Sequence, residues 1–168
     1  MIERTVEFLR WLPNEIITLL IAMLPIAELR GAIPWALTGG GLTWPEAYLF
    51  ATLGNFLPVI PLLLLIEPLS NWLRGYKTFD IFFTLLFART RRRGKLVERY
   101  EALGLALFVS IPLPVTGAWT GAVAAFVFGI RLSYSIIAII AGILIAGVVV
   151  TLASLGVMET IKAIGILP

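Results

Sequence analysis

The stretch Leu24-Pro-Ile-Ala-Glu-Leu-Arg-Gly-Ala-Ile-Pro34 decides the fold, because it places Glu28 and Arg30 inside an otherwise apolar segment, Ile16 to Leu37. An ionisable side chain near the centre of a bilayer costs roughly 2.5 to 3.5 kcal/mol on insertion scales, so it faces a cavity or a partner. Charges at this depth mark functional sites by default. We therefore take Glu28 and Arg30 as the first candidates for binding a substrate or a coupling ion.

Two prolines and a glycine in the same stretch predict that the helix breaks here. Pro25 and Pro34 lack a backbone donor, and Gly31 weakens helix propagation. Broken backbone at membrane depth is tolerated only where it is buried in protein or lines water. The stretch is therefore expected to form a tip, with a short helix on either side.

The arms on the two sides of the tip are too short to cross a membrane. Glu15 to Pro25 holds 11 residues, about 16 Å of helix at ~1.5 Å per residue, which is half a bilayer. The second arm runs from Ala32 to about Thr38 and stops at Gly39 to Gly41. We expect a re-entrant hairpin that returns the glycine run to the side of Met1; a single kinked span is the rival interpretation.

The composition identifies an integral membrane protein. The 168 residues are 60% hydrophobic and 14% charged, with a mean hydropathy of +0.99, beyond the range of a soluble domain of this size. A crossing needs about 20 apolar residues, so a chain of this length has room for a few spans but not for a separate soluble domain. We therefore expect a single membrane domain over 1–168. Cysteine and histidine are absent, which removes disulfides and the usual zinc ligands, and we expect neither metal nor cofactor. The net charge of +3 does not imply nucleic acid.

Two further segments each fit one crossing. Pro45 to Ile66 is 22 residues long, and Glu67-Pro68 is expected to end it. Leu132 to Gly156 is the second clear span. Met1 to Leu12 and Phe79 to Ala88 are amphipathic or short, so we expect them to lie in the membrane interface.

A second hairpin is expected between these spans. Ala102 to Ile130 is 29 residues long, more than one crossing needs, and Pro112-Leu-Pro-Val-Thr-Gly117 cuts it. A hairpin with this turn at its tip fits better than one span. Thr116 is expected to cap the returning half-helix, and Gly117 allows close backbone approach.

An internal repeat supports this layout. Gly41 and Gly129 are 88 residues apart, as are Gly54 and Gly142. The same offset brings the first tip into register with the second. Each half therefore consists of a hairpin followed by a span, and because a hairpin returns while a span crosses, the two halves are inverted.

The predicted fold class is an all-α integral membrane protein with two inverted repeats. The repeats cover about 14–66 and about 102–156, each a re-entrant helical hairpin followed by a transmembrane helix. A connector, about 67–101, holds a short interfacial helix. This is a transporter architecture, with the site at the repeat interface near the midplane.

Basic residues indicate the orientation. In the hairpin layout nine Lys and Arg residues share the side of the middle loop, against three near the termini. The basic loop 74–99 is therefore expected in the cytoplasm of a multi-pass plasma membrane protein. A plain four-span layout gives an asymmetry at least as good, so charge does not decide between them. The length of 102–130 and the proline-bearing tips favour hairpins.

Glu28 and Arg30 are two residues apart, and on a continuous helix they would lie on different faces. Either the tip is not helical or each finds another partner. They can form a structural ion pair that closes the tip. Alternatively, Glu28 takes up a proton and Arg30 holds an anion.

If both tips meet, two half-helix N-termini point at one spot near the midplane, where free N–H groups favour an anion. For the tryptophans near the tips, packing or interface anchoring is at least as good an interpretation. The candidate substrate- or ion-binding residues are Glu28, Arg30, Gly31, Asn55, Pro112, Pro114, Thr116, Gly117, Trp119 and Thr120.

Three stretches resemble the signatures of a known family: Glu28-Leu-Arg-Gly-Ala-Ile-Pro34, Gly54-Asn55 followed by Pro58, and Pro112-Leu-Pro-Val-Thr-Gly-Ala-Trp-Thr-Gly121. They look like those of the putative small multidrug export protein family, which is similar to the DedA/VTT superfamily of membrane proteins. The resemblance implies a hairpin and inverted-repeat fold, and a transporter or lipid-translocating function with Glu28 and Arg30 as the essential acidic and basic pair. DedA relatives are linked to moving polyprenyl-phosphate carrier lipids with proton or ion coupling.

The leading functional hypothesis is an ion- or proton-coupled transporter of an anionic amphiphile such as a polyprenyl-phosphate carrier lipid. The alternatives are a proton-coupled small multidrug exporter and a non-transporting membrane assembly protein. Membrane lipids and protons or another coupling ion are the expected partners, and a homo-oligomer stays open. We do not expect an enzyme, because the sequence shows no nucleophile and base pair, metal set or phosphate loop.

Overall fold

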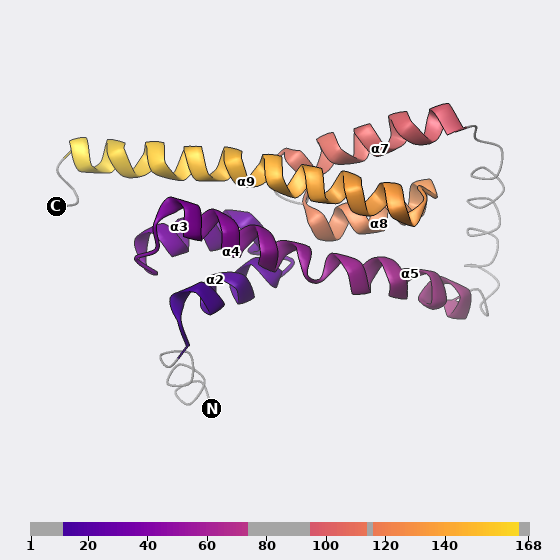
Figure 1. The fold of residues 1–168 in the computed structure, drawn as a ribbon, viewed down its shortest axis with the longest axis horizontal. Helices are drawn as coiled ribbons and strands as arrows, with labels where there is room; N and C mark the ends of the chain where they lie inside the picture. Colours follow the sequence, from indigo (N-terminus) through magenta and orange to yellow (C-terminus); the bar gives the residue numbers. More distant parts are fainter. Residues whose placement is uncertain (1–11, 74–94, 114–115, 165–168) are drawn as a thin grey trace. The chain divides into compact units, whose positions relative to one another are not determined.

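The computed structural model describes residues 12–73, 95–113 and 116–164, and within these ranges it contains helices and no strand (Figure 1). The helices are α2 (Asn14–Met23), α3 (Glu28–Thr38), α4 (Trp44–Phe56), α5 (Val59–Leu73), α7 (Lys95–Ser110), α8 (Ala118–Phe128) and α9 (Leu132–Ala163). The predicted all-α class is confirmed. The predicted interfacial helix at 79–88, nearly all of the one at 1–12, and the basic loop as far as residue 94 lie outside the described residues.

Contacts divide the chain into two compact units. The first unit comprises residues 1–55 and 145–168, and the second comprises residues 56–144. The predicted single membrane domain and its two repeats, about 14–66 and about 102–156, stay a prediction.

In the first unit, α2 and α3 pack against each other on either side of the predicted tip. Small residues permit this, since Ala22 on α2 and Ala32 and Ala36 on α3 have no exposed surface. α4 approaches α2 closely at Gly54, where a Cβ atom would lie 2.8 Å from the Cα atom of Leu19 and closer still to its carbonyl oxygen. Gly54 therefore permits a helix crossing that any side chain would obstruct.

In the second unit, α8 packs against both α5 and α7. α9 approaches α7 closely at Gly142, where a Cβ atom would lie 2.6 Å from the Cβ atom of Val109. α8 ends at Gly129, whose φ of 65° lies in the left-handed region that glycine adopts without strain. The N–H groups of Gly129 and Ile130 donate to carbonyls in the last turn, each at 2.9 Å, which closes the helix end.

The predicted span Pro45 to Ile66 is not one continuous helix. It is interrupted at Leu57 and Pro58, because Pro58 has no N–H to donate to the carbonyl four residues earlier. α5 then continues through Glu67-Pro68 to Leu73, so the predicted end at that dipeptide is wrong. A proline removes only one helical hydrogen bond, so an apolar helix such as α5 can continue through a proline in its interior.

The second predicted span is longer than expected, because α9 runs on past Gly156 to Ala163, a total of 32 residues. A glycine in a helix interior weakens the helix only modestly, and neither a proline nor a left-handed residue stops α9 there. Among the described residues, α9 and the segment Trp44–Ile66 are each long and apolar enough to cross a membrane.

Large apolar side chains lie on the outside of both units. More than half of the surface of Leu64, Leu107, Ile137 and Leu152 is exposed. Lipid is the natural solvent for large apolar side chains that are exposed in such number. The exposed surface and the two long apolar helices are those of an integral membrane protein.

Candidate functional site

The first predicted tip is a short turn between α2 and α3. The N–H of Leu24 donates to the carbonyl of Ile21 at 3.1 Å, and the N–H of Glu28 donates to the carbonyl of Leu24 at 3.0 Å. Ile26, in the middle of the turn, is 92% exposed. The helix break predicted at Pro25 is therefore present, and its outer surface is apolar.

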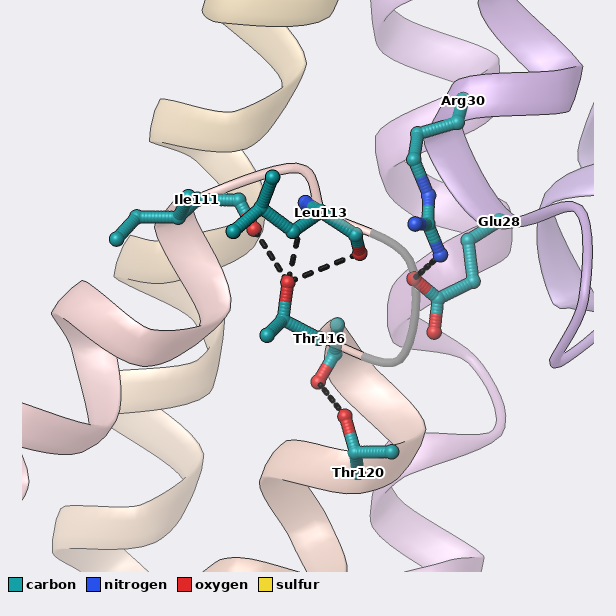
Figure 2. Close-up of polar contacts among 7 residues, drawn as sticks. Glu28, Arg30, Ile111, Leu113, Thr116 and Thr120 are labelled. Carbon is teal, nitrogen blue, oxygen red and sulfur yellow. Dashed lines mark hydrogen bonds and ion pairs between the residues drawn. The ribbon is translucent and has the colours of Figure 1, made fainter.

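Glu28 begins α3 with an unusual backbone. Its φ is 46°, and no other non-glycine residue that the structure describes has a positive φ. This conformation lets its side chain reach Arg30 two residues later, with 3.7 Å between Glu28 Oε2 and Arg30 Nη2 (Figure 2). The two side chains are 7% and 26% exposed, respectively. Glu28 and Arg30 both lie in the first turn of α3, and the left-handed backbone of Glu28 brings the two side chains together.

Gly31 and Pro34 do not break the helix, which corrects part of the prediction. Both lie inside α3, which runs unbroken from Glu28 to Thr38. Gly31 instead provides room, since a Cβ atom there would lie 2.9 Å from the Cβ atom of Ala27. Pro34 cannot donate to the carbonyl of Arg30, so that carbonyl lacks its ordinary helical donor.

Asn55 lies near the end of α4, directly after the tightly packed Gly54. It is 2% exposed, and its Oδ1 atom has no hydrogen-bond partner among the described residues. A buried amide oxygen without a donor costs about 1 to 3 kcal/mol, so its retention needs an explanation other than stability. The next proline, Pro58, also leaves the carbonyl of Gly54 without its ordinary helical donor.

The second predicted tip is the segment between α7 and α8. The N–H of Leu113 donates to the hydroxyl oxygen of Thr116 at 3.1 Å. That hydroxyl in turn donates to the carbonyl of Ile111 at 2.6 Å, with the carbonyl of Leu113 at 3.0 Å (Figure 2). Pro112 lies inside this loop, and the predicted site residue Pro114 lies outside the described residues.

The structure corrects the predicted role of Thr116. The residue before α8 is Gly117, and no side chain caps the helix. The Thr116 hydroxyl binds the loop behind it, because Ile111 and Leu113 turn their backbone groups toward it. The hydroxyl of Thr120, one turn into α8, donates to the carbonyl of Gly117 at 3.2 Å, and Trp119 lies half-buried beside it in sequence.

The structure therefore assembles two local groups from the predicted residues. The first is the ion pair of Glu28 and Arg30, and the second is the hydrogen-bonded loop from Ile111 to Thr120. Each group belongs to one unit, and the predicted meeting of the two tips stays a prediction.

One candidate was missed from the sequence. Glu101 lines a cavity in the second unit together with Leu105 and Phe108, at helical spacing on α7. The prediction began its apolar segment at Ala102 and so left this carboxylate outside. The spacing of Glu101, Leu105 and Phe108 was the signal that could have found it.

The fold and the first site define a helical membrane protein with a charged pair at a helix break. The model of the family described as "Putative small multi-drug export protein" matches residues 28–149, and the chain belongs to this family. The matched range begins at Glu28 and includes Asn55 and Thr116. No curated protein and no solved structure matches the chain.

Proposed function

We propose that this protein is an ion-coupled membrane transporter whose substrate site is the Glu28–Arg30 pair. The observation that carries the proposal is a buried carboxylate 3.7 Å from a partly exposed guanidinium at a helix break. A non-glycine residue is held at positive φ there, and strained backbone of this kind clusters at functional sites.

The proposed substrate is an anionic amphiphile, such as a polyprenyl-phosphate carrier lipid. Arg30 presents several N–H donors in a planar fork that matches phosphate, and it stays charged. It lies in the first turn of α3, where the positive end of the helix dipole also favours an anion. The resemblance to DedA proteins supports the same substrate class.

The pair suggests how substrate and proton are coupled. An anionic head group competes with the Glu28 carboxylate for Arg30. Loss of the Arg30 cation removes an interaction that favours the ionised form of the buried Glu28 carboxyl group, so Glu28 takes up a proton. Anion binding and proton uptake then occur together, and release of the anion lets Glu28 return its proton and re-form the pair.

The experiment is a thermal unfolding assay of the protein in nanodiscs with a short-chain polyprenyl phosphate. A ligand at 100 times its dissociation constant stabilises the folded state by about 2.7 kcal/mol. We expect this stabilisation in the wild type, and its loss in Arg30→Ala and in Arg30→Lys, since lysine lacks the bidentate fork. Lys162→Ala removes an exposed cation near the end of α9 and is the control. Full stabilisation of Arg30→Ala would remove Arg30 from the site.

A second candidate function is proton-coupled export of cationic drugs, which the description of the family favours. In that case Glu28 alone would bind cation and proton in turn. Stabilisation by a lipophilic cation that is lost in Glu28→Gln, with no response to the phosphate, would select it. A non-transporting assembly protein is the third candidate, and it would respond to neither ligand.

We further propose a multi-pass location in the plasma membrane with the basic loop 74–99 in the cytoplasm. Membrane lipids, a coupling proton and a second copy of the chain are the proposed partners. Transport in this scheme needs no covalent chemistry.

A further inference from the structure

The first unit contains a groove of about 330 Å³ between α4 and the C-terminal part of α9. Its lining residues are Trp44, Tyr48, Val148, Thr151, Leu152 and Leu155. The two helices are in close contact at one end of the groove, because a Cβ atom at Gly147 would lie 2.8 Å from the Tyr48 ring and 2.9 Å from the Thr52 methyl group. Sites for small ligands in proteins begin at about 300 Å³ and are mostly apolar, so the groove has room for part of a lipid chain.

The groove lies near one end of both helices. The start of α4 faces the later part of α9, so the two helices run in opposite directions (Figure 1). Trp44 is 57% exposed, and tryptophan is enriched where a membrane meets water. On α9, Leu155 lies about 6 Å along the helix axis from Glu159, at ~1.5 Å per residue. In a bilayer the groove is therefore just below the head-group layer, where the upper part of a phospholipid acyl chain would occupy it.

A charged pair continues the same face of α9 beyond the groove. Glu159 and Lys162 follow Leu155 by four and seven residues, and this helical spacing places them on the face of Leu155. Lys162 Nζ lies 3.9 Å from Glu159 Oε1, and the two side chains are 50% and 79% exposed, respectively. An exposed pair of this kind contributes little to stability, so it can exchange partners with a ligand at little cost. The ligand that satisfies both residues carries an anion and a cation of its own.

We propose that this site binds phosphatidylethanolamine, with one acyl chain in the groove, the phosphate on Lys162 and the ammonium group on Glu159. A primary ammonium donates charge-assisted hydrogen bonds to a carboxylate, which the trimethylammonium of phosphatidylcholine cannot do. Phosphatidylglycerol has the phosphate but no cation, so it would place a second negative charge beside Glu159. The site lies outside the Glu28–Arg30 pair, and its lipid is a resident of the groove and not the transported substrate.

Two valines on α9 provide a matched test of the groove. Val148 lines the groove and Val157 does not, and the two side chains are 48% and 58% exposed, respectively. Nine residues separate them, which is two and a half turns at about 3.6 residues per turn, so Val157 lies on the opposite face of the helix. Val148→Trp should therefore fill the groove, whereas Val157→Trp adds the same side chain away from it.

The experiment measures lipid retention by native mass spectrometry of the full chain. The protein is released from micelles that hold equal amounts of phosphatidylethanolamine, phosphatidylcholine and phosphatidylglycerol with the same acyl chains. We expect the wild type and Val157→Trp to retain one phosphatidylethanolamine about two- to fivefold more often than either other lipid, the discrimination that an exposed charged pair provides. Val148→Trp should lose this lipid. Glu159→Gln should shift the preference to phosphatidylglycerol, and Lys162→Gln should lower the retention of all three lipids.

Equal retention of the three lipids by the wild type would overturn the proposal, because lipids that only surround the protein are not selected by their head groups. This comparison needs no variant and carries the test where Val148→Trp does not fold. Equal retention of phosphatidylethanolamine by Val148→Trp and Val157→Trp would also reject the groove as the site.

Arg30→Ala should retain phosphatidylethanolamine like the wild type, so failure of this proposal leaves the Glu28–Arg30 site untouched. The nanodisc titration with polyprenyl phosphate separates the two sites from the other direction. Loss of its stabilising effect in Lys162→Ala, but not in Arg30→Ala, would place the polyprenyl phosphate in the groove and contradict both proposals.

Discussion

Glu28 holds a backbone conformation that costs a non-glycine residue about 1 to 3 kcal/mol. Two variants separate this cost from the loss of the ion pair. Glu28→Gln removes the charge and keeps the strain, whereas Glu28→Gly removes both. We expect Glu28→Gly to unfold with a free energy about 1 kcal/mol higher than that of Glu28→Gln, measured by denaturation in the same detergent. Glycine is also more flexible when unfolded, which reduces the difference.

Both Glu28 variants should lose proton-coupled transport, because neither side chain titrates. Reconstituted vesicles with an imposed pH gradient provide the measurement. If Glu28→Gln still transports substrate with unchanged pH dependence, Glu28 is excluded from proton coupling.

Asn55 gives a second prediction at the level of one residue. Its buried Oδ1 atom has no partner among the described residues, so an apolar side chain of similar size should cost nothing in packing and remove an unsatisfied group. We expect Asn55→Leu to be as stable as the wild type or up to about 2 kcal/mol more stable, and to transport less. A loss of more than about 1 kcal/mol would mean that the amide is satisfied in the membrane, for instance by water.

At the level of elements, the glycine positions should differ sharply in their tolerance of alanine. At Gly54 a Cβ atom meets the backbone of Leu19, which cannot rotate away, so Gly54→Ala should destabilise the packing of α2 and α4 by about 1 to 3 kcal/mol. At Gly104 the same atom meets nothing, and Gly104→Ala should stabilise by about 0.5 to 1 kcal/mol through helix propensity. Thermal unfolding of Gly54→Ala and Gly104→Ala, measured in parallel, tests both expectations. Equal stability of both would contradict the close crossing at Gly54.

The elements also show what could be predicted from the sequence and what could not. Both helix breaks were predicted from Pro25 and from the Pro112 region, and the helical class followed from hydropathy. The position of a proline did not by itself predict where a helix ends, because Pro58 interrupts a helix whereas Pro34 lies inside α3 and Pro68 inside α5. Each proline removes one hydrogen bond, and the packing around it decides whether the helix continues.

The contacts within the site were beyond sequence reasoning for a related reason. Pairing of Glu28 with Arg30 depends on a single φ angle, and no spacing rule includes a left-handed glutamate. The sequence also could not show which backbone groups the Thr116 hydroxyl binds. In the structure it binds backbone groups of Ile111 and Leu113 in the preceding loop and does not cap the following helix α8.

At the level of the whole molecule, the helices recur in step with the glycine repeat. α4 begins at Trp44 and α9 at Leu132, which are 88 residues apart, the same offset as Gly41 and Gly129. Both of these glycines also have a positive φ, 62° and 65°. The recurrence supports the repeat, and the inversion of its halves stays a prediction.

Topology can be tested directly, because the chain has no cysteine of its own. Single cysteines at Thr5, Thr38 and Thr90 can be labelled with an impermeant thiol reagent in oriented vesicles. Thr38 is exposed at the end of α3 and is the reporter of the first hairpin. We expect Thr5→Cys and Thr38→Cys to label from one side and Thr90→Cys from the other. Labelling of Thr38→Cys together with Thr90→Cys would favour the four-span layout.

The length of α9 bears on the kind of bilayer that suits this protein. Its apolar part, from Leu132 to Met158, ends just before the exposed pair of Glu159 and Lys162. These 27 residues span about 40 Å at ~1.5 Å per residue, against a hydrocarbon thickness of about 30 Å. Tilt alone would have to reach about 40°, the upper limit seen for membrane helices. Hydrophobic mismatch is therefore smaller in thick, long-chain bilayers, whereas thin bilayers would strain α9.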